Sequence, residues 1–249
     1  MCLIAFNWKN HPEYKLILVA NRDEYYERPT ASLHQWEEGF YAGKDLKAGG
    51  TWMGFHPSGK FAALTNFRDM ENEQDHTRSR GDLVKGFLED NLSPIDYLKS
   101  IGKFKSEYNG FSLIVADGED MWVYSNYGNG IQRVSPGLHA ISNAFLDTPW
   151  PKVGTAKSEM ERMLKNPFSI DDLLDRLQSR QPALEANLPA TGLNPNLEKA
   201  VSAQLIQVED YYGTVNTTAL LWKHDGNVLI KEKRIIPETE INQVKLMVN

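Results

Sequence analysis

Strand-like segments that occur in neighbouring pairs, joined by short polar turns, constrain the fold of this chain most strongly. Residues 2–8 and 15–20 form the first pair and flank a polar turn at 9–12. The same pattern recurs at 51–55 with 60–65, 111–116 with 121–125, and 214–222 with 228–235. Further strand-like segments lie at 131–134, which follows a turn at 127–130, at 138–142, and at 244–248. Tight turns join antiparallel strands, whereas parallel strands need long crossover connections. The sequence therefore predicts antiparallel sheets built from hairpins.

Helical segments occur in two blocks and do not alternate with the strands. They are predicted at 79–90, 93–101, 152–165 and 171–179. Ser93 is a typical N-cap residue, and Pro94 follows it at the first helical position, where its missing N–H costs nothing. Residues 181–196 are rich in Pro, Asn and Ala and are predicted to form a long loop. Segregated helices and hairpins, without a break in composition, favour one layered α+β domain over residues 1–249.

Composition excludes several classes of function. Cys2 is the single cysteine among 249 residues, so the chain has neither an internal disulfide nor a multi-cysteine zinc site. Its 33 acidic residues against 27 Lys and Arg give a net charge of −6, which argues against nucleic-acid binding. No apolar run reaches the roughly 20 residues that span a bilayer, so we expect a cytoplasmic protein without stable membrane insertion. The six histidines are dispersed, and we predict no metal and no cofactor.

The position of the lone cysteine suggests chemistry. A buried strand cysteine that behaves as a small hydrophobe is one interpretation. The other is that removal of Met1 leaves Cys2 as the N-terminus, so that one residue carries both a thiol and an α-amine. That amine has a pKa near 7.7–8.0 and can serve as a base. Acylation of Cys2 as a membrane anchor is a weaker interpretation, because no polybasic segment follows.

A polar cluster ends the second strand-like segment, at residues 21–24. A solvated hairpin end is the ordinary explanation of such a cluster. The strand is expected to pair with the one that carries Cys2, however, which would bring its end close to the thiol. Arg22 would then stabilise a thiolate and Asp23 would orient the α-amine.

Five motifs, in order along the chain, resemble one family. They are Met1-Cys2 with Ala20-Asn21-Arg22-Asp23-Glu24, Ala48-Gly49-Gly50-Thr51-Trp52, Leu64-Thr65-Asn66-Phe67-Arg68, Ile141-Ser142-Asn143 running on to Leu146-Asp147-Thr148-Pro149-Trp150-Pro151-Lys152-Val153, and Tyr211-Tyr212-Gly213-Thr214. Together they are similar to the Asn-Arg-Asp-Glu family, also called the Transport and Golgi Organization protein 2 family. That family in turn resembles the cysteine branch of the N-terminal-nucleophile hydrolases.

The resemblance implies a fold and a set of roles. The implied fold is a four-layer αββα sandwich of two antiparallel sheets. Cys2 would be the nucleophile, Arg22 and Asp23 would serve its thiol and amine, and Asn66 and Asn143 would bind the oxyanion. From the asparagines alone, a turn or cap role is the usual interpretation at a strand end. The family motifs also contribute the residues that we expect to bind substrate: Asn21, Glu24, Trp52, Phe67 and Arg68.

The chain departs from the family pattern at one position. Where the family has Gly-Thr-Arg, this sequence has Gly213-Thr214-Val215, so a basic residue that would contact a substrate carboxylate or phosphate is absent. Two functions therefore remain open. One is hydrolysis of an amide or thioester of a small acyl substrate by Cys2. The alternative is a non-catalytic protein on the same fold that binds and carries haem, or acyl-CoA and lipid.

Overall fold

The computed structural model describes residues 2–74, 78–128 and 130–248, and in them the strands form two seven-stranded antiparallel sheets. The first sheet has the order β10 (Gly137–Ile141), β1 (Cys2–Trp8), β2 (Tyr14–Tyr25), β12 (Tyr212–Lys223), β13 (Asn227–Arg234) and β14 (Glu240–Met247), with β11 (Gln207–Val208) also paired to β12. The second runs β3 (Thr30–Gln35), β4 (Tyr41–Asp45), β5 (Met53–His56), β6 (Lys60–Asn66), β7 (Phe111–Ala116), β8 (Met121–Ser125) and β9 (Ile131–Arg133).

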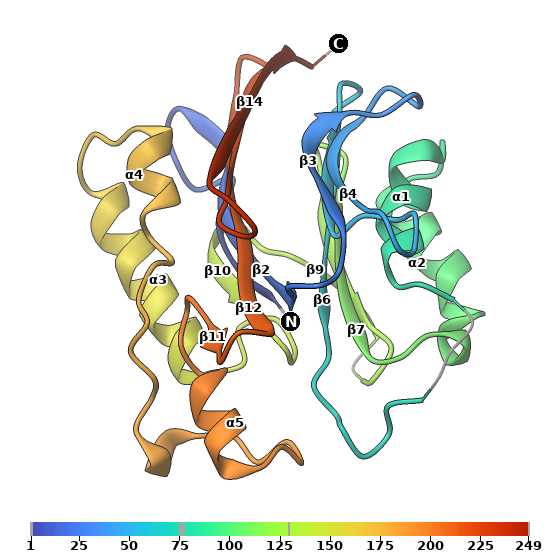
Figure 1. The fold of residues 1–249 in the computed structure, drawn as a ribbon. Coiled ribbons are helices and arrows are strands. Elements are labelled where there is room, and N and C mark those ends of the chain that lie inside the picture. Colours follow the sequence, from blue (N-terminus) through green and yellow to red (C-terminus); the bar gives the residue numbers. More distant parts are fainter. Residues whose placement is uncertain (1, 75–77, 129, 249) are drawn as a thin grey trace.

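Helices cover the outer face of each sheet (Figure 1). They are α1 (Gly81–Glu89) and α2 (Pro94–Gly102) on the second sheet, and α3 (Pro151–Leu164) and α4 (Ile170–Leu174) on the first. A fifth helix, α5 (Pro195–Ala200), and the 3₁₀ turns Lys105–Glu107 and Glu185–Asn187 lie in the connections. The order helix, sheet, sheet, helix confirms the predicted four-layer αββα sandwich.

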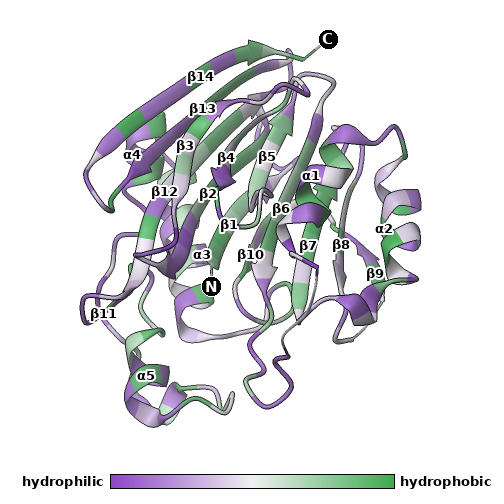
Figure 2. Ribbon diagram, turned by 45° about the vertical axis from the view of Figure 1, so that its right-hand side comes forward, coloured by the Kyte–Doolittle hydropathy of each residue, from purple (hydrophilic) through white to green (hydrophobic). Residues whose placement is uncertain are grey.

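Strand β1 is buried on both faces, which explains its largely apolar sequence. Ile4 and Phe6 pack between the sheets, whereas Leu3 and Ala5 face the α3 and α4 layer. Successive side chains of a strand point to opposite faces, so Cys2, like Ile4, lies on the face between the two sheets. At the sheet edge, β14 alternates between half-buried and exposed residues. Figure 2 shows both green and purple bands along this strand, so apolar and polar residues both lie on the edge.

Several predicted elements need correction. Strands β3 and β4 were not predicted, because Leu33 is the only fully buried residue of β3 and the segment lacks an apolar alternation. The predicted loop at 181–196 overlaps the start of helix α5. Asn194 is the N-cap of this helix and accepts a hydrogen bond of 2.9 Å from Leu197 N. The predicted cap of α2 is confirmed, with Asp96 N donating to Ser93 Oγ at 3.3 Å. Helix α4 is shorter than predicted and ends at Leu174.

Candidate active site

Cys2 lies directly opposite Arg22 in the antiparallel ladder between β1 and β2. Residues directly opposite each other in such a ladder share one face of the sheet. Both line a cavity of about 670 Å³. In Figures 1 and 2 the start of β1, marked N, lies between α5 and the second sheet. The register of the two strands therefore brings Cys2 to the end of β2, as the sequence predicts.

The backbone of Cys2 is held from the neighbouring strand. Ser142 follows β10 and donates a hydrogen bond of 2.9 Å from its hydroxyl to the carbonyl oxygen of Cys2. Ser142 is buried, so this contact is shielded from water. It fixes the orientation of the first residue of β1 at the cavity.

Asp23 is buried and tied to the central strand β12. Thr214 Oγ1 donates to Asp23 Oδ1 at 2.6 Å. The ladder shifts register between Thr214 and Asn216, so Thr214 lies opposite Asp23 while Asn216 lies opposite Arg22. Val215 is the extra residue of this β-bulge, and its side chain is buried and does not line the cavity.

Burial dominates the electrostatics of the nucleophile candidate. It raises the pKa of the Cys2 thiol above its usual value, and the charge of Asp23 adds to the rise. The charge of Arg22 and the backbone N–H of Asp23 act in the opposite direction. Burial also raises the pKa of Asp23, against the charge of Lys152 and the hydrogen bond from Thr214. The thiol is therefore protonated near neutral pH, and its reaction with an electrophile requires a base.

Arg22 is fixed on three sides. Its Nη1 donates to Thr30 Oγ1 at 3.0 Å, its Nη2 lies 3.5 Å from Glu24 Oε2, and its guanidinium stacks 4.2 Å from the centre of the Trp52 ring. Glu24 and Trp52, which we expect to bind substrate, also line the cavity. A stacked and hydrogen-bonded guanidinium holds its charge in one place beside the thiol.

Asn66 and Phe67 reach the cavity from the end of β6. The Phe67 ring stacks on Tyr127 with centroids 4.8 Å apart and meets Phe145 edge-on at 5.0 Å. Because Phe67 is packed between two rings, the chain direction at Asn66 is well defined. Asn66 is therefore presented to the cavity from a fixed stretch of backbone.

Asn143 does not line the cavity and is fully buried. Its Nδ2 donates to the carbonyl oxygen of Asn66 at 3.0 Å, and its Oδ1 accepts from Arg68 Nη2 at 3.1 Å. The backbone N–H of Arg68 donates to the Asn143 carbonyl at 2.8 Å. Asn143 was expected to bind the oxyanion together with Asn66. In the structure its side chain holds the backbone of Asn66.

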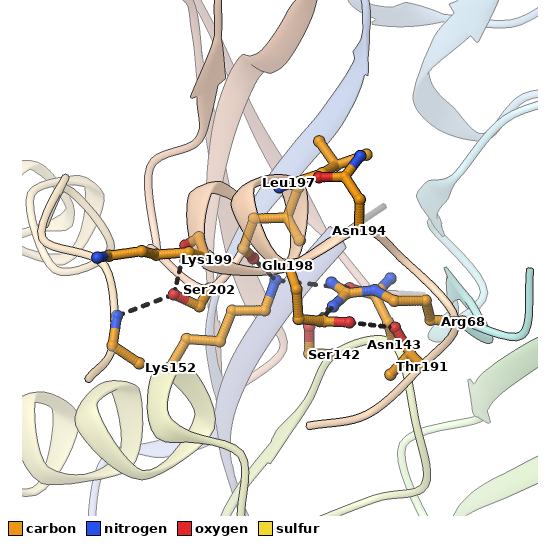
Figure 3. A network of polar contacts seen from close by, with 12 residues as sticks. Arg68, Ser142, Asn143, Lys152, Thr191, Asn194, Leu197, Glu198, Lys199 and Ser202 are labelled. Carbon is orange, nitrogen blue, oxygen red and sulfur yellow. Dashed lines mark hydrogen bonds and ion pairs between the residues drawn. The ribbon is translucent and has the colours of Figure 1, made fainter. Parts of the chain in front are cut away.

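Arg68 links the cavity to helix α5. Its Nη1 forms a buried ion pair with Glu198 Oε1, and Thr191 Oγ1 donates to Glu198 Oε2 at 2.5 Å. Figure 3 shows Glu198 between Arg68 and Thr191. The ring of Trp150 stacks on the Arg68 guanidinium at 4.9 Å. Arg68, which we expect to bind substrate, thus lines the cavity with its charge already paired.

Lys152 also belongs to this network; it stands in a family motif, but the motif alone gave it no role in the site. It is 3% exposed, and its Nζ donates to the carbonyl oxygen of Val201 at 3.1 Å and lies 3.5 Å from Asn143 Oδ1. Burial, together with the charge of Arg68, lowers the pKa of Lys152 to about 8. The sequence did contain a sign that Lys152 is buried, because it lies on the apolar face of α3 with Ala156.

Asn21 lies apart from the cavity. Its side chain donates to the carbonyl oxygens of Leu177 at 2.8 Å and Gln204 at 2.9 Å, and accepts from Thr217 Oγ1 at 2.7 Å. It faces the layer of α3 and α4, one residue out of phase with Arg22. The structure therefore places this expected substrate-binding residue in a hydrogen-bond network that joins the connection after α4 to the sheet.

Two further expectations concern metals and membranes. Within residues 2–74, 78–128 and 130–248, no group of three or more His, Cys, Asp or Glu side chains is arranged to hold a metal ion. In the same part of the chain, every helix is too short or too polar to cross a bilayer.

An αββα sandwich with a cysteine at the cavity end of its first strand defines the class of N-terminal-nucleophile-hydrolase-like folds. The N-acylethanolamine-hydrolyzing acid amidase ortholog of Caenorhabditis elegans matches with a TM-score of 0.50 and 10% identity, over 88% of this chain and 92% of that one. A mutant of the conjugated bile acid hydrolase from Clostridium perfringens matches with a TM-score of 0.53 and 9% identity, over 97% and 92%. At these identities the similarity establishes the fold alone.

The chain belongs to the Transport and Golgi organisation 2 family, whose sequence profile matches residues 1–237. The homolog of Bos taurus is 36% identical over 262 residues, covering 95% of this chain and 94% of the relative. The homolog of Homo sapiens is 34% identical over 263 residues with the same coverage, and the Drosophila melanogaster protein is 26% identical over 248 residues, covering 89% and 87%. These matches confirm the family resemblance that the motifs indicated.

Proposed function

We propose that this protein is a cysteine amidohydrolase that cleaves an amide or thioester of a small acyl substrate with Cys2 as its nucleophile. The observation that carries the proposal is the position of Cys2, which lines the cavity together with Arg22, Asp23 and Asn66. Two neighbours in fold are named as an amidase and a bile acid hydrolase, which supports the reaction class.

The first requirement is cleavage of the peptide bond before Cys2, because the proposed base is the α-amine of Cys2 itself. Cleavage frees an α-amine whose pKa is ordinarily near 7.7–8.0. The amine accepts the thiol proton as Sγ attacks the carbonyl carbon of the substrate. This pairing compensates for the raised pKa of the buried thiol.

The positions of Asn66 and Asn143 support the following assignment of the remaining steps. The side-chain amide of Asn66 donates to the oxyanion that forms on the substrate, and Asn143 acts as a positioning residue behind it. The ammonium then returns its proton to the leaving nitrogen or sulfur as that atom departs. Water, deprotonated by the same amine, attacks the resulting thioester, which releases the carboxylic acid and restores the thiol.

Arg22 and Asp23 have separate tasks in this scheme. Arg22 is opposite Cys2 and stabilises the thiolate as the proton leaves. Asp23, fixed by Thr214, stabilises the ammonium form of the α-amine. Both act through charge at short range in a site shielded from water.

Mass spectrometry of the purified protein tests the proposal. We expect a mass that lacks the residue before Cys2 and, after incubation with p-nitrophenyl octanoate, the addition of one octanoyl group. The Cys2→Ala variant should show no adduct. A chain that retains Met1, or one that has an N-terminal Cys2 but neither forms an adduct nor releases octanoate, would contradict hydrolysis and favour the binding alternative, with haem or an acyl-CoA or lipid as the ligand.

A further inference from the structure

The cavity carries more positive than negative side chains, although the whole chain has a net charge of −6. Its cationic lining residues are Arg22, Arg28, Lys47, Arg68, Arg78 and Arg80, and its acidic ones are Asp23, Glu24, Asp45 and Glu73. A cavity with an excess of one sign focuses the field and raises the local concentration of the opposite ion. The lining therefore favours an anionic ligand.

Arg80 differs from the other arginines in its partners. The others form ion pairs, namely Arg22 with Glu24 at 3.5 Å, Arg28 with Asp45 at 2.6 Å, Arg78 with Glu107 at 3.0 Å, and Arg68 with Glu198. The Nη1 of Arg80 donates to the carbonyl oxygen of Gly110 at 3.0 Å. Among the residues that the structure describes, no carboxylate lies within 4.0 Å of its guanidinium. A guanidinium has five N–H donors, so one carbonyl leaves most of the fork available to a ligand.

Two glycines hold the backbone of Arg80 in place. The start of α1 packs against the loop before β5 so closely that a Cβ on Gly50 would lie 2.7 Å from the carbonyl carbon of Gly81. Thr51 N also donates to Gly81 O at 3.3 Å. Arg80 is thus fixed by its backbone on one side and by Gly110 on the other, which is the preorganisation that a specific anion contact needs.

Arg80 also lies within electrostatic range of Cys2. Burial lowers the pKa of Arg80, and the negative charges of Glu73, Glu24 and an ionised Cys2 act against that effect. Both side chains line the same cavity. A molecule that fills the cavity can therefore contact both side chains.

The opposite side of the cavity is apolar. Leu193, Leu197 and Val201 line it from α5 and the residues around it. In Figures 1 and 2 the start of β1 lies between α5 and α1. A ligand that spans the cavity across Cys2 thus meets hydrocarbon on one side and a guanidinium on the other.

We propose that Arg80 determines substrate specificity by binding a carboxylate or phosphate on the amine half of an acyl-amide substrate, while Leu193, Leu197 and Val201 contact the acyl half. The identification of the two halves rests on the proposed hydrolysis at Cys2. The anion contact itself is a binding property and does not require turnover. It gives this chain a cationic contact although the family Arg is replaced by the buried Val215.

Calorimetric titration of the Cys2→Ser variant tests the proposal without turnover. The ligands are N-octanoylglycine, N-octanoylethanolamine and its O-phosphate, which share one acyl chain and differ in the charge of the amine half. We expect at least one of the anionic ligands to bind about 10- to 100-fold more tightly than the neutral one, as charge-assisted hydrogen bonds do. The comparison of the two anions distinguishes a carboxylate from a phosphate site.

Substitution of the arginine gives the second arm. Arg80→Gln should abolish the preference for the anion, and Arg80→Met serves in its place if the glutamine variant does not fold. Arg78→Gln is the matched control, because it removes the same charge from the same cavity while Arg78 is already paired with Glu107. Equal affinities for all three ligands, or a preference that survives in Arg80→Gln, would overturn the proposal. If the preference for the anion depends on Arg80 but Cys2 is never acylated, the anion contact is supported and the proposed hydrolysis is contradicted.

Discussion

Thr214 donates a 2.6 Å hydrogen bond from its hydroxyl to Oδ1 of Asp23, and both residues are buried where β2 and β12 pair. The same hydroxyl oxygen accepts a hydrogen bond of 2.9 Å from Ile206 N. Because the oxygen is occupied as an acceptor by a backbone N–H, its proton is directed to the carboxylate. This contact joins the last family motif of the chain to the first.

Replacing Thr214 with valine should raise the pKa of Asp23 further. Burial already raises that pKa, and the hydrogen bond from Thr214 favours the ionised form, so its loss shifts the pKa upward. Carbon-13 NMR of the aspartate carboxyl groups across a pH series measures the shift. We expect a loss of about 1–3 kcal/mol in the free energy of unfolding, since Ile206 N also loses its acceptor. Thr214→Ser should restore both values, and an unchanged Asp23 titration in Thr214→Val would contradict this role.

Removing the charge of Glu198 should loosen α5 from the sheets. The pair of Glu198 with Arg68 is buried, and the loss of one partner leaves an uncompensated charge, which costs about 3–5 kcal/mol. In Glu198→Gln we therefore expect faster amide hydrogen exchange in residues 191–201, with little change in β1. Glu185→Gln is the control, because Glu185 pairs with Lys199 at the surface, where such pairs contribute about 0–1 kcal/mol. Equal protection in the two variants would show that this pair does not hold the helix.

The part of the site that could be predicted is the part set by neighbouring strands. Cys2 and Arg22 belong to consecutive strands joined by a short turn, and a hairpin fixes their register locally. Apolar runs on both sides of the turn were enough to predict the pairing. Glu24 lies two residues beyond Arg22 on the same strand and therefore faces the same side of the sheet.

The unpredicted part depends on contacts between distant segments. Glu198 lies 130 residues from Arg68 in the chain, and Asn21 bonds Leu177 across 156 residues. Single-sequence patterns carry no information about such distances. The bulge at Val215 could not be predicted either, because one extra residue in a buried strand leaves the apolar pattern of the segment unchanged.

The buried carboxyl of Glu232 should make stability depend on pH. Burial raises its pKa from 4.5 to about 7, although Leu33 N donates to it at 2.7 Å and Thr218 Oγ1 at 3.3 Å. The unfolded chain therefore ionises first, and the contribution of Glu232 to stability falls as pH rises from 4.5 to about 7. The size of this loss is about 3 kcal/mol.

Chemical denaturation of wild type and Glu232→Gln at pH 5 and pH 8 measures this effect. Glutamine keeps the acceptor for Leu33 N and removes the ionisation. Wild type should lose free energy of unfolding between pH 5 and pH 8. In the variant this loss should be smaller by about 3 kcal/mol. Glu161→Gln, an exposed substitution on α3, should leave the difference unchanged. Parallel pH dependences of wild type and Glu232→Gln would refute the assignment.

The close approach of Gly50 to Gly81 makes a final prediction. A Cβ on Gly50 would lie 2.7 Å from a backbone atom, which cannot rotate away, so Gly50→Ala must push the start of α1 from the second sheet. We expect a loss of about 1–3 kcal/mol in the free energy of unfolding, as overpacking causes. Gly154→Ala on α3 is the matched control, because a Cβ there meets nothing within 4 Å and alanine favours a helix by about 1 kcal/mol. Thermal unfolding should thus move in opposite directions for the two variants, and a Gly50→Ala protein as stable as wild type would contradict the role given to this contact in holding Arg80.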